Sequence, residues 1–192
     1  MGPARAQDQR RDKTKPGVSV LSGPKCAGKS TLYRAWLLTG TIPTTAEFVN
    51  ADLYETAHLQ HIADVQARSK QAQRWTETRR AELLQAGKSF ASETVFSHDS
   101  KLALIADAQA HGFFVMLLVV ALDQPERLLA RVAQRVAEGG HPVPPERILS
   151  RYPRTLANLA HAVRMADAAI LYDSQDLTPG THTAVALCKK DW

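Results

Sequence analysis

The sequence predicts an α/β fold built around a mostly parallel sheet of five or six strands. Short apolar, β-branched runs alternate along the chain with longer helical segments, a pattern typical of parallel strands joined by helices. The ten-residue apolar run from Phe113 to Leu122 is too short to cross a bilayer and suits a buried central strand. A glycine-rich loop separates the first apolar run from the first helical segment. In sheets of this kind ligands bind at the carboxyl ends of the strands.

The same alternation gives the order of the elements. Strands are expected at Val18–Ser22, Glu47–Asn50, Ser89–Ser92, Phe113–Leu122 and Ala169–Tyr172, with a sixth at Thr183–Cys188. Helices are expected at about residues 29–38, 56–86, 99–111, 125–137 and 155–165. Gly87 and Gly112 stand where two of these helices should end, because glycine is favoured just after a helix.

Length and charge indicate one domain with a basic leader. The chain has 192 residues, 44% of them hydrophobic, and a net charge of +5. Five basic and two acidic residues lie among the first fifteen, so most of the excess charge is there. We expect residues 1–16 to be a disordered leader and residues 17–192 to be a single domain. A nucleic-acid arm is the alternative for the leader, but the rest of the chain is nearly balanced in charge, so nucleic acid is not the expected partner.

The cysteine content favours a reducing compartment. Cys26 and Cys188 are the only cysteines, which argues against a disulfide framework and fits the cytoplasm. No secretory segment or membrane span is predicted.

The glycine-rich loop matches the phosphate-binding motif G-x-x-x-x-G-K-[ST]. Its residues are Gly23, Pro24, Lys25, Cys26, Ala27, Gly28, Lys29 and Ser30, followed by Thr31. In such a loop the backbone amides surround phosphates, the lysine reaches the β- and γ-phosphates, and the hydroxyl of Ser30 can bind Mg²⁺. The motif predicts that residues 23–31 bind the phosphates of a nucleotide, and the absence of a guanine-reading N-K-x-D sequence disfavours a GTPase.

Two carboxylates follow predicted strands and should lie beside this loop. Asp52 comes just after the second strand and could accept the proton of an acceptor hydroxyl or orient Mg²⁺; the alternative is a helix N-cap. Glu93 and Thr94 follow the third strand, where Glu93 could bind substrate hydroxyls or the water shell of Mg²⁺. The alternative for Glu93 is a polar strand end.

Two basic segments could contact an anionic ligand. Arg131 and Arg135 precede a Gly-Gly-His-Pro-Val-Pro turn and Arg151 and Arg154 follow it, which predicts a lid at about residues 131–154. Salt-bridged helices around a rigid turn are the alternative. The long helical segment carries five further cations, which we interpret as a solvated face or, alternatively, as a substrate-facing helix: Arg68, Lys70, Arg74, Arg79 and Arg80.

Several of these segments together resemble the zeta-toxin family of P-loop kinases, in particular its short ATP-binding members. The matching segments are Gly23–Thr31, Phe48–Asp52, Ser89–Ser97, Arg131–His141 with Val143, Pro144, Arg151, Tyr152, Arg154 and Leu156, and Tyr172–Ser174. The resemblance implies a three-layer nucleotide-kinase-like fold that uses ATP and Mg²⁺. It also implies that Asp52 is the general base, that Glu93 binds the substrate, that Lys29 is the P-loop lysine, and that Arg135 and Arg151 are the lid arginines.

The resemblance further implies a phosphotransferase acting on a hydroxyl of a small molecule. In well-described members the substrate is UDP-N-acetylglucosamine, and the kinase is the toxin of a toxin–antitoxin pair. Two departures bear on that substrate: Leu53-Tyr54-Glu55 and Val95-Phe96 stand where the larger toxins usually carry arginine-containing segments. A housekeeping metabolite or nucleoside kinase, and a nucleotide-gated interaction module without transfer activity, are the alternative functions.

Overall fold

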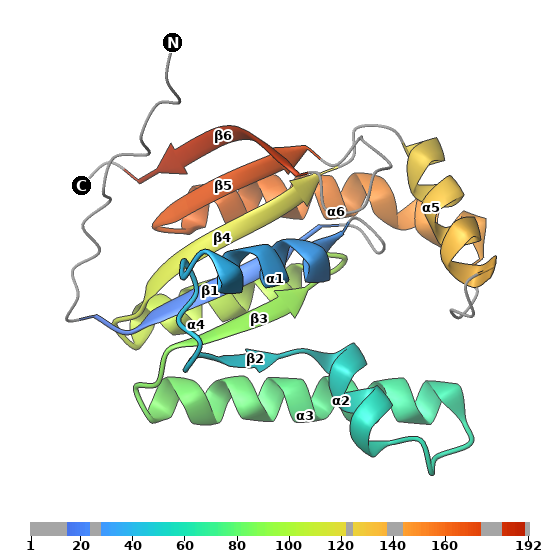
Figure 1. The fold of residues 1–192 in the computed structure, drawn as a ribbon, viewed down its shortest axis with the longest axis horizontal. Helices are drawn as coiled ribbons and strands as arrows, with labels where there is room; N and C mark the ends of the chain where they lie inside the picture. Colours follow the sequence, from blue (N-terminus) through green and yellow to red (C-terminus); the bar gives the residue numbers. More distant parts are fainter. Residues whose placement is uncertain (1–14, 24–27, 122–124, 138–143, 174–181, 191–192) are drawn as a thin grey trace.

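Six strands form one sheet at the centre of the molecule (Figure 1), as a computed structural model shows for residues 15–23, 28–121, 125–137, 144–173 and 182–190. The strands are β1 Gly17–Ser22, β2 Glu47–Val49, β3 Phe90–Thr94, β4 Phe114–Ala121, β5 Ala168–Asp173 and β6 Thr183–Lys189. Their order across the sheet is β2-β3-β1-β4-β5-β6. Only β6 runs antiparallel to its neighbour, so the predicted mostly parallel α/β sheet is confirmed.

Helices cover both faces of the sheet and give three layers. They are α1 Lys29–Leu38, α2 Ala51–His58, α3 Val65–Gln85, α4 Ala103–Ala110, α5 Pro125–Ala137 and α6 Pro145–Met165, with a 3₁₀ turn at Asp99–Leu102. Leu32 of α1 and Leu128 of α5 belong to the hydrophobic core on one face. Side chains of α3, α4 and α6 belong to the core on the other face, where α4 and α6 lie behind the sheet in Figure 1.

The apolar run of β4 supplies both cores. Val115, Leu117 and Val119 belong to the core beneath α4 and α6. Met116, Leu118 and Val120 belong to the core on the face of α1. Because successive side chains of a strand point to opposite faces, a central strand buried on both sides needs an unbroken apolar sequence.

The predicted single helix over residues 56–86 is wrong, because the segment forms two helices. Helix α2 begins earlier, where the amide of Leu53 donates to Oδ1 of Asn50 at 3.1 Å. Helix α3 begins after Asp64, whose Oδ1 accepts from the amide of Gln66 at 2.8 Å. Asparagine and aspartate side chains satisfy the first free amides of a helix, so the Asn50 cap starts α2 before the expected boundary and the Asp64 cap starts α3 after the break that follows His58.

The predicted start of the last helix is also wrong. Helix α6 begins at Pro145, ten residues before the expected boundary at 155, and it contains Pro153. Proline is favoured in the first helical turn, since its missing amide would have no partner there. Ile148 and Thr155 are buried on either side of Pro153, so packing holds the helix through the proline.

The expected helix over 99–111 begins as the 3₁₀ turn and becomes α-helical at Ala103. The glycines behave as predicted: Gly87 and Gly112 follow helices with positive φ angles of 64° and 77°. In the part of the chain that the structure describes, no helix is both long enough and apolar enough to cross a membrane. Residues 1–14 lie outside the described ranges, so the disordered leader stays a prediction.

Candidate active site

Lys29 is the central cation of the candidate site. It is the first residue of α1, is only 5% exposed, and its Nζ donates to the carbonyl of Gly23 at 3.2 Å. The same nitrogen lies 3.4 Å from Oε1 of Glu93, at the end of β3. Strands β1 and β3 are adjacent and parallel, so the loop after β1 and the last residues of β3 meet at one edge of the sheet.

Two glycines shape the loop around Lys29. Gly23 has a φ of 149°, and a Cβ built there would lie 2.1 Å from the backbone carbonyl oxygen of Val120. Gly28 has a φ of 93°, and its carbonyl accepts the amides of Thr31 and Leu32 at 3.1 Å. The first turn of α1 contains no acidic residue. The start of this helix, with the positive end of its dipole, therefore suits the binding of an anion.

Glu93 connects this loop to β2. Its Oε2 accepts from the hydroxyl of Ser30 at 3.2 Å and from Nδ2 of Asn50 at 2.9 Å. One carboxylate thus contacts the P-loop lysine, the predicted Mg²⁺-binding hydroxyl and the N-cap of α2. An ammonium, a hydroxyl and a carboxylate at a strand edge fit the recognition of phosphate with a hard cation.

Asp52 and Thr94 lie close in sequence to these contacts. Asp52 is exposed in the first turn of α2, two residues after Asn50. The alternative interpretation of Asp52 as the N-cap is wrong, because Asn50 caps the helix. Thr94 is buried at the end of β3, where it pairs with Ser22 of β1. The side chain of Asp52 is therefore exposed to solvent, two residues along the chain from the Asn50 that contacts Glu93.

Several other predicted site residues lie outside the described part of the chain. Pro24, Lys25, Cys26 and Ala27 lie outside the described residues, as do residues 138–143 of the predicted lid and the side chains of Arg131 and Arg135. Arg151 is exposed near the start of α6, where the described side chains provide it no hydrogen bond or ion pair. The lid consequently stays a prediction.

Sequence reasoning missed two residues of the site. Asn50 was assigned to the end of a strand, although an asparagine between a strand and an acidic helical segment is an N-cap signal. Arg80 was interpreted as part of a solvated helical face, but it is only 7% exposed. Arg68 of the same helix is also buried, with its Nε 3.0 Å from Oε1 of Glu55. The solvated-face interpretation is wrong for these two arginines.

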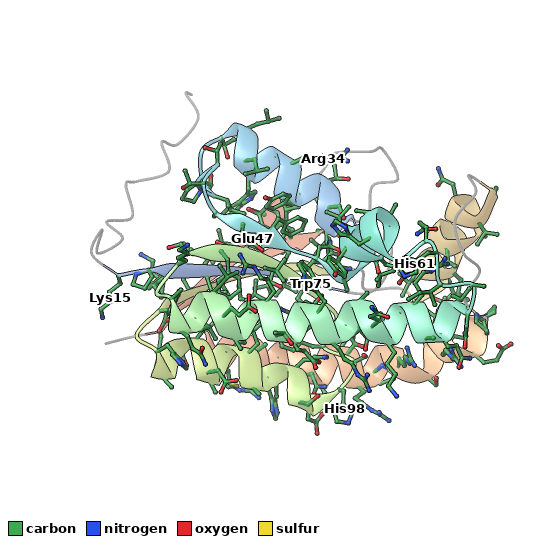
Figure 2. The ribbon with its side chains drawn as sticks, turned by 90° about the horizontal axis from the view of Figure 1, so that it is seen from below. Lys15, Arg34, Glu47, His61, Trp75 and His98 are labelled. Carbon is green, nitrogen blue, oxygen red and sulfur yellow. The ribbon has the colours of Figure 1, made fainter. Side chains whose placement is uncertain are left out.

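An aromatic contact fixes α2 against α3. The rings of Tyr54 and Trp75 stack with centroids 3.9 Å apart and planes 5° apart. Trp75 lies on the side of α3 that faces α2 and the sheet (Figure 2). Asp52 therefore lies between two contacts that hold the first turn of α2: the Asn50 cap before it and the Tyr54–Trp75 stack after it.

Comparison with known proteins gives the same fold. The family model described as "Zeta toxin" matches residues 3–178. A chain of the PezAT chromosomal toxin–antitoxin system of the human pathogen Streptococcus pneumoniae is similar in structure, with a TM-score of 0.65 and 16% identity, over 91% of this chain and 71% of that one. A chain of the AvrRxo1-ORF1:ORF2 complex with ATP has a TM-score of 0.65 and 20% identity. That match covers 93% of this chain and 60% of the AvrRxo1 chain.

A third similar structure is a Chloroflexus aurantiacus protein with a provisional description as a kinase. Its TM-score is 0.56 at 20% identity, over 70% of this chain and 75% of that one. No curated protein matches the sequence. At these identities the structural matches establish the fold, and the family match covers most of the sequence.

Proposed function

The chain belongs to the zeta-toxin family, and we propose that it is an ATP-dependent phosphotransferase that phosphorylates a hydroxyl group of a small molecule. Family membership and the kinase-like neighbours support a kinase-type phosphotransferase. One observation carries the proposal for this chain: a single carboxylate, Glu93, contacts Lys29, Ser30 and Asn50 at the carboxyl edge of the sheet. Phosphoryl transfer depends mainly on positioned charges, and these residues supply them.

The residues present fit the triphosphate of ATP. Lys29 is a buried ammonium, and the amides at the start of α1 can donate to phosphate oxygens. Gly23 lets the chain pass within contact of β4, where any side chain would collide with the backbone of Val120. Mg²⁺, when bound, would neutralise charge on the phosphates, with the hydroxyl of Ser30 as its protein ligand.

Asp52 is proposed as the general base. Its exposed position in the first turn of α2 leaves the carboxylate accessible to an acceptor hydroxyl. As the acceptor oxygen bonds to the γ-phosphorus and the bond to the leaving ADP oxygen breaks, Asp52 takes the hydroxyl proton. Glu93 and Thr94 are proposed to hold the acceptor, and Arg135 and Arg151 to approach the transferring group from a lid over residues 131–154.

The first candidate acceptor is the nucleotide sugar UDP-N-acetylglucosamine. We propose that the protein acts in the cytoplasm as the toxin of a toxin–antitoxin pair, with an antitoxin protein as its partner. The support is family membership and the likeness to a chain from a toxin–antitoxin system. Expression of the chain without an antitoxin should arrest growth, and the Asp52→Asn variant should not.

Transfer of label from γ-labelled ATP tests the activity directly. Purified protein is incubated with Mg²⁺ and a panel of UDP-sugars, nucleosides and other metabolites. Asp52→Asn should lose transfer but keep ATP binding, whereas Asp107→Asn, which alters an exposed carboxylate on α4, should behave like the wild type. Label on a UDP-amino sugar supports the first candidate, and label on another acceptor supports a metabolite kinase. Transfer at the wild-type rate by Asp52→Asn would refute the assigned base.

A further inference from the structure

Arg80 is a buried cation directly behind the carboxyl end of β3. Its guanidinium donates from Nε to Oγ of Ser92 at 2.8 Å and from Nη2 to the carbonyl of Glu93 at 2.9 Å. The hydroxyl of Ser92 in turn donates to the carbonyl of Val49 at 2.9 Å. One side chain of α3 is therefore linked to the last residues of both β2 and β3.

These links act where the strand pairing is short. Strand β2 pairs with β3 over only the three residues from Glu47 to Val49, and Val49 lies opposite Ser92. The next residue after Val49 is Asn50, whose Nδ2 donates to the carboxylate of Glu93. The contacts of Arg80 thus fix the backbone on both sides of the Asn50–Glu93 hydrogen bond.

The partners of Arg80 are not those of a structural ion pair. Within the described ranges no carboxylate lies within 4 Å of its guanidinium, and both of its hydrogen bonds go to neutral oxygens. Burial lowers the pKa of Arg80 to about 10, opposed by the nearby charge of Glu77, so the side chain is still positively charged at neutral pH. A buried cation with neutral partners costs desolvation energy that an apolar residue of similar size would avoid.

We propose that Arg80 is a positioning residue of the phosphotransfer site, which fixes Glu93 against Lys29 and Ser30 and holds the start of α2 in place. This inference rests on the proposed function, because it assigns Arg80 a role in the same site. The planar guanidinium suits the role, since two of its nitrogens reach two oxygens in a fixed geometry. A lysine at the same position would keep the charge but offer a single nitrogen.

Three variants separate positioning from simple stabilisation. Arg80→Met keeps an unbranched side chain without the charge, and Arg80→Lys keeps the charge without the planar group. Arg74→Met is the matched control, because Arg74 is exposed on the same helix. Each full-length protein is examined by thermal unfolding, by ATP binding with and without Mg²⁺, and by the rate of transfer from ATP.

The expected result is a separation between binding and turnover. Arg80→Met should bind metal-free ATP within about threefold of the wild type, since its contacts go to β3 and not to the loop or α1. It should lose the effect of Mg²⁺ on binding, and turnover should fall by ten- to a hundredfold, as misplacement of a catalytic group does. Arg80→Lys should recover thermal stability but not turnover, and Arg74→Met should match the wild type.

Either of two results from the Arg80 variants would overturn the proposal. One is wild-type turnover and Mg²⁺ response in Arg80→Met; the other is full recovery of both in Arg80→Lys, which would mean that buried charge alone suffices. If Arg80→Met does not fold, Ser92→Ala removes the acceptor of Nε and should give a weaker form of the same defect, and unchanged behaviour there also refutes positioning. The effect of Mg²⁺ on ATP binding can be measured without an acceptor, so it tests the role of Arg80 even if the wild type transfers nothing. A wild type that binds no ATP would instead refute the proposed function.

Discussion

Glu93 of β3 and Lys29 at the start of α1 form an ion pair, with Oε1 and Nζ 3.4 Å apart. Only 17% of the glutamate side chain and 4% of the lysine side chain are exposed. The pair lies where phosphate oxygens are proposed to bind, so a phosphate must compete with Glu93 for the same ammonium. In the proposed enzyme the carboxylate therefore balances the buried charge of Lys29 when ATP is absent.

Glu93→Gln should separate this balancing role from catalysis. The ligand-free variant should be less stable by about 1–3 kcal/mol, because Lys29 loses its charged partner in a buried site. Metal-free ATP should bind more tightly than to the wild type, since no carboxylate competes for the ammonium, while transfer should be lost. Thermal unfolding and calorimetric titration measure these effects. Glu55→Gln is the control, because Glu55 pairs with Arg68 away from the P-loop; weaker ATP binding by Glu93→Gln would contradict the competition.

Two substitutions of Asn50 should distinguish its cap from its contact with Glu93. Asn50→Ala removes both and should destabilise the protein by about 1 kcal/mol through the lost cap alone. Asn50→Asp keeps a good cap for α2 but places a second carboxylate against Glu93, without the Nδ2 donor. Transfer should fall in both variants. Circular dichroism and unfolding curves measure the loss of the cap. Wild-type transfer by Asn50→Asp would show that the Asn50–Glu93 hydrogen bond is not needed for transfer.

Much of the fold could be predicted because it depends on patterns local to the sequence. The run that became β4 was recognisable as a strand buried on both faces, and the P-loop stood between a strand and a helix as its motif requires. The division between α2 and α3 was missed because composition favours helix throughout, and the side-chain cap of Asp64 decides where α3 begins. The start of α6 could not be placed from the sequence because burial on both sides of Pro153 holds the helix through the proline.

Only those site residues that lie at the ends of adjacent strands could be predicted to come together. The meeting of Lys29, Ser30 and Glu93 follows from adjacent parallel strands ending at one edge. Arg80 could not be distinguished from Arg79 by sequence, since neighbouring residues on a charged helix differ only in the direction they face. The structure buries Arg80 beneath β3, whereas Arg79 pairs with Glu47 and Glu82 near the surface.

The Glu47–Arg79 pair should make stability depend on pH in the acid range. Hydrogen bonds from Arg79 lower the pKa of Glu47 below its ordinary value of 4.5. A carboxyl whose pKa is lower in the folded state stabilises the protein above the unfolded value, and this contribution is lost as the pH falls through the folded value. Glu47→Gln should therefore lower the melting temperature at neutral pH but not well below pH 4.5. In an Arg79→Met background the pH-dependent effect should be much smaller, because only desolvation and the charge of Lys88 remain to shift the pKa of Glu47. An undiminished pH dependence in that background would contradict the assignment to Arg79.

Gly23→Ala should strongly weaken nucleotide binding by displacing the start of the P-loop. The new Cβ would lie 2.1 Å from the carbonyl oxygen of Val120, which belongs to the backbone of β4 and has little room to move. The backbone at φ 149° is also unfavourable for any residue with a side chain. We expect a loss of about 2–4 kcal/mol of stability and at least a tenfold loss of ATP affinity.

Gly40→Ala is the matched control for Gly23→Ala. The φ of Gly40 is 69°, and nothing lies within 4 Å of the new Cβ, so this substitution should cost only about 1–2 kcal/mol of backbone strain. Unfolding curves and ATP titration on both variants separate collision from strain, and equal ATP affinities would show that the loop does not depend on the close approach at Gly23.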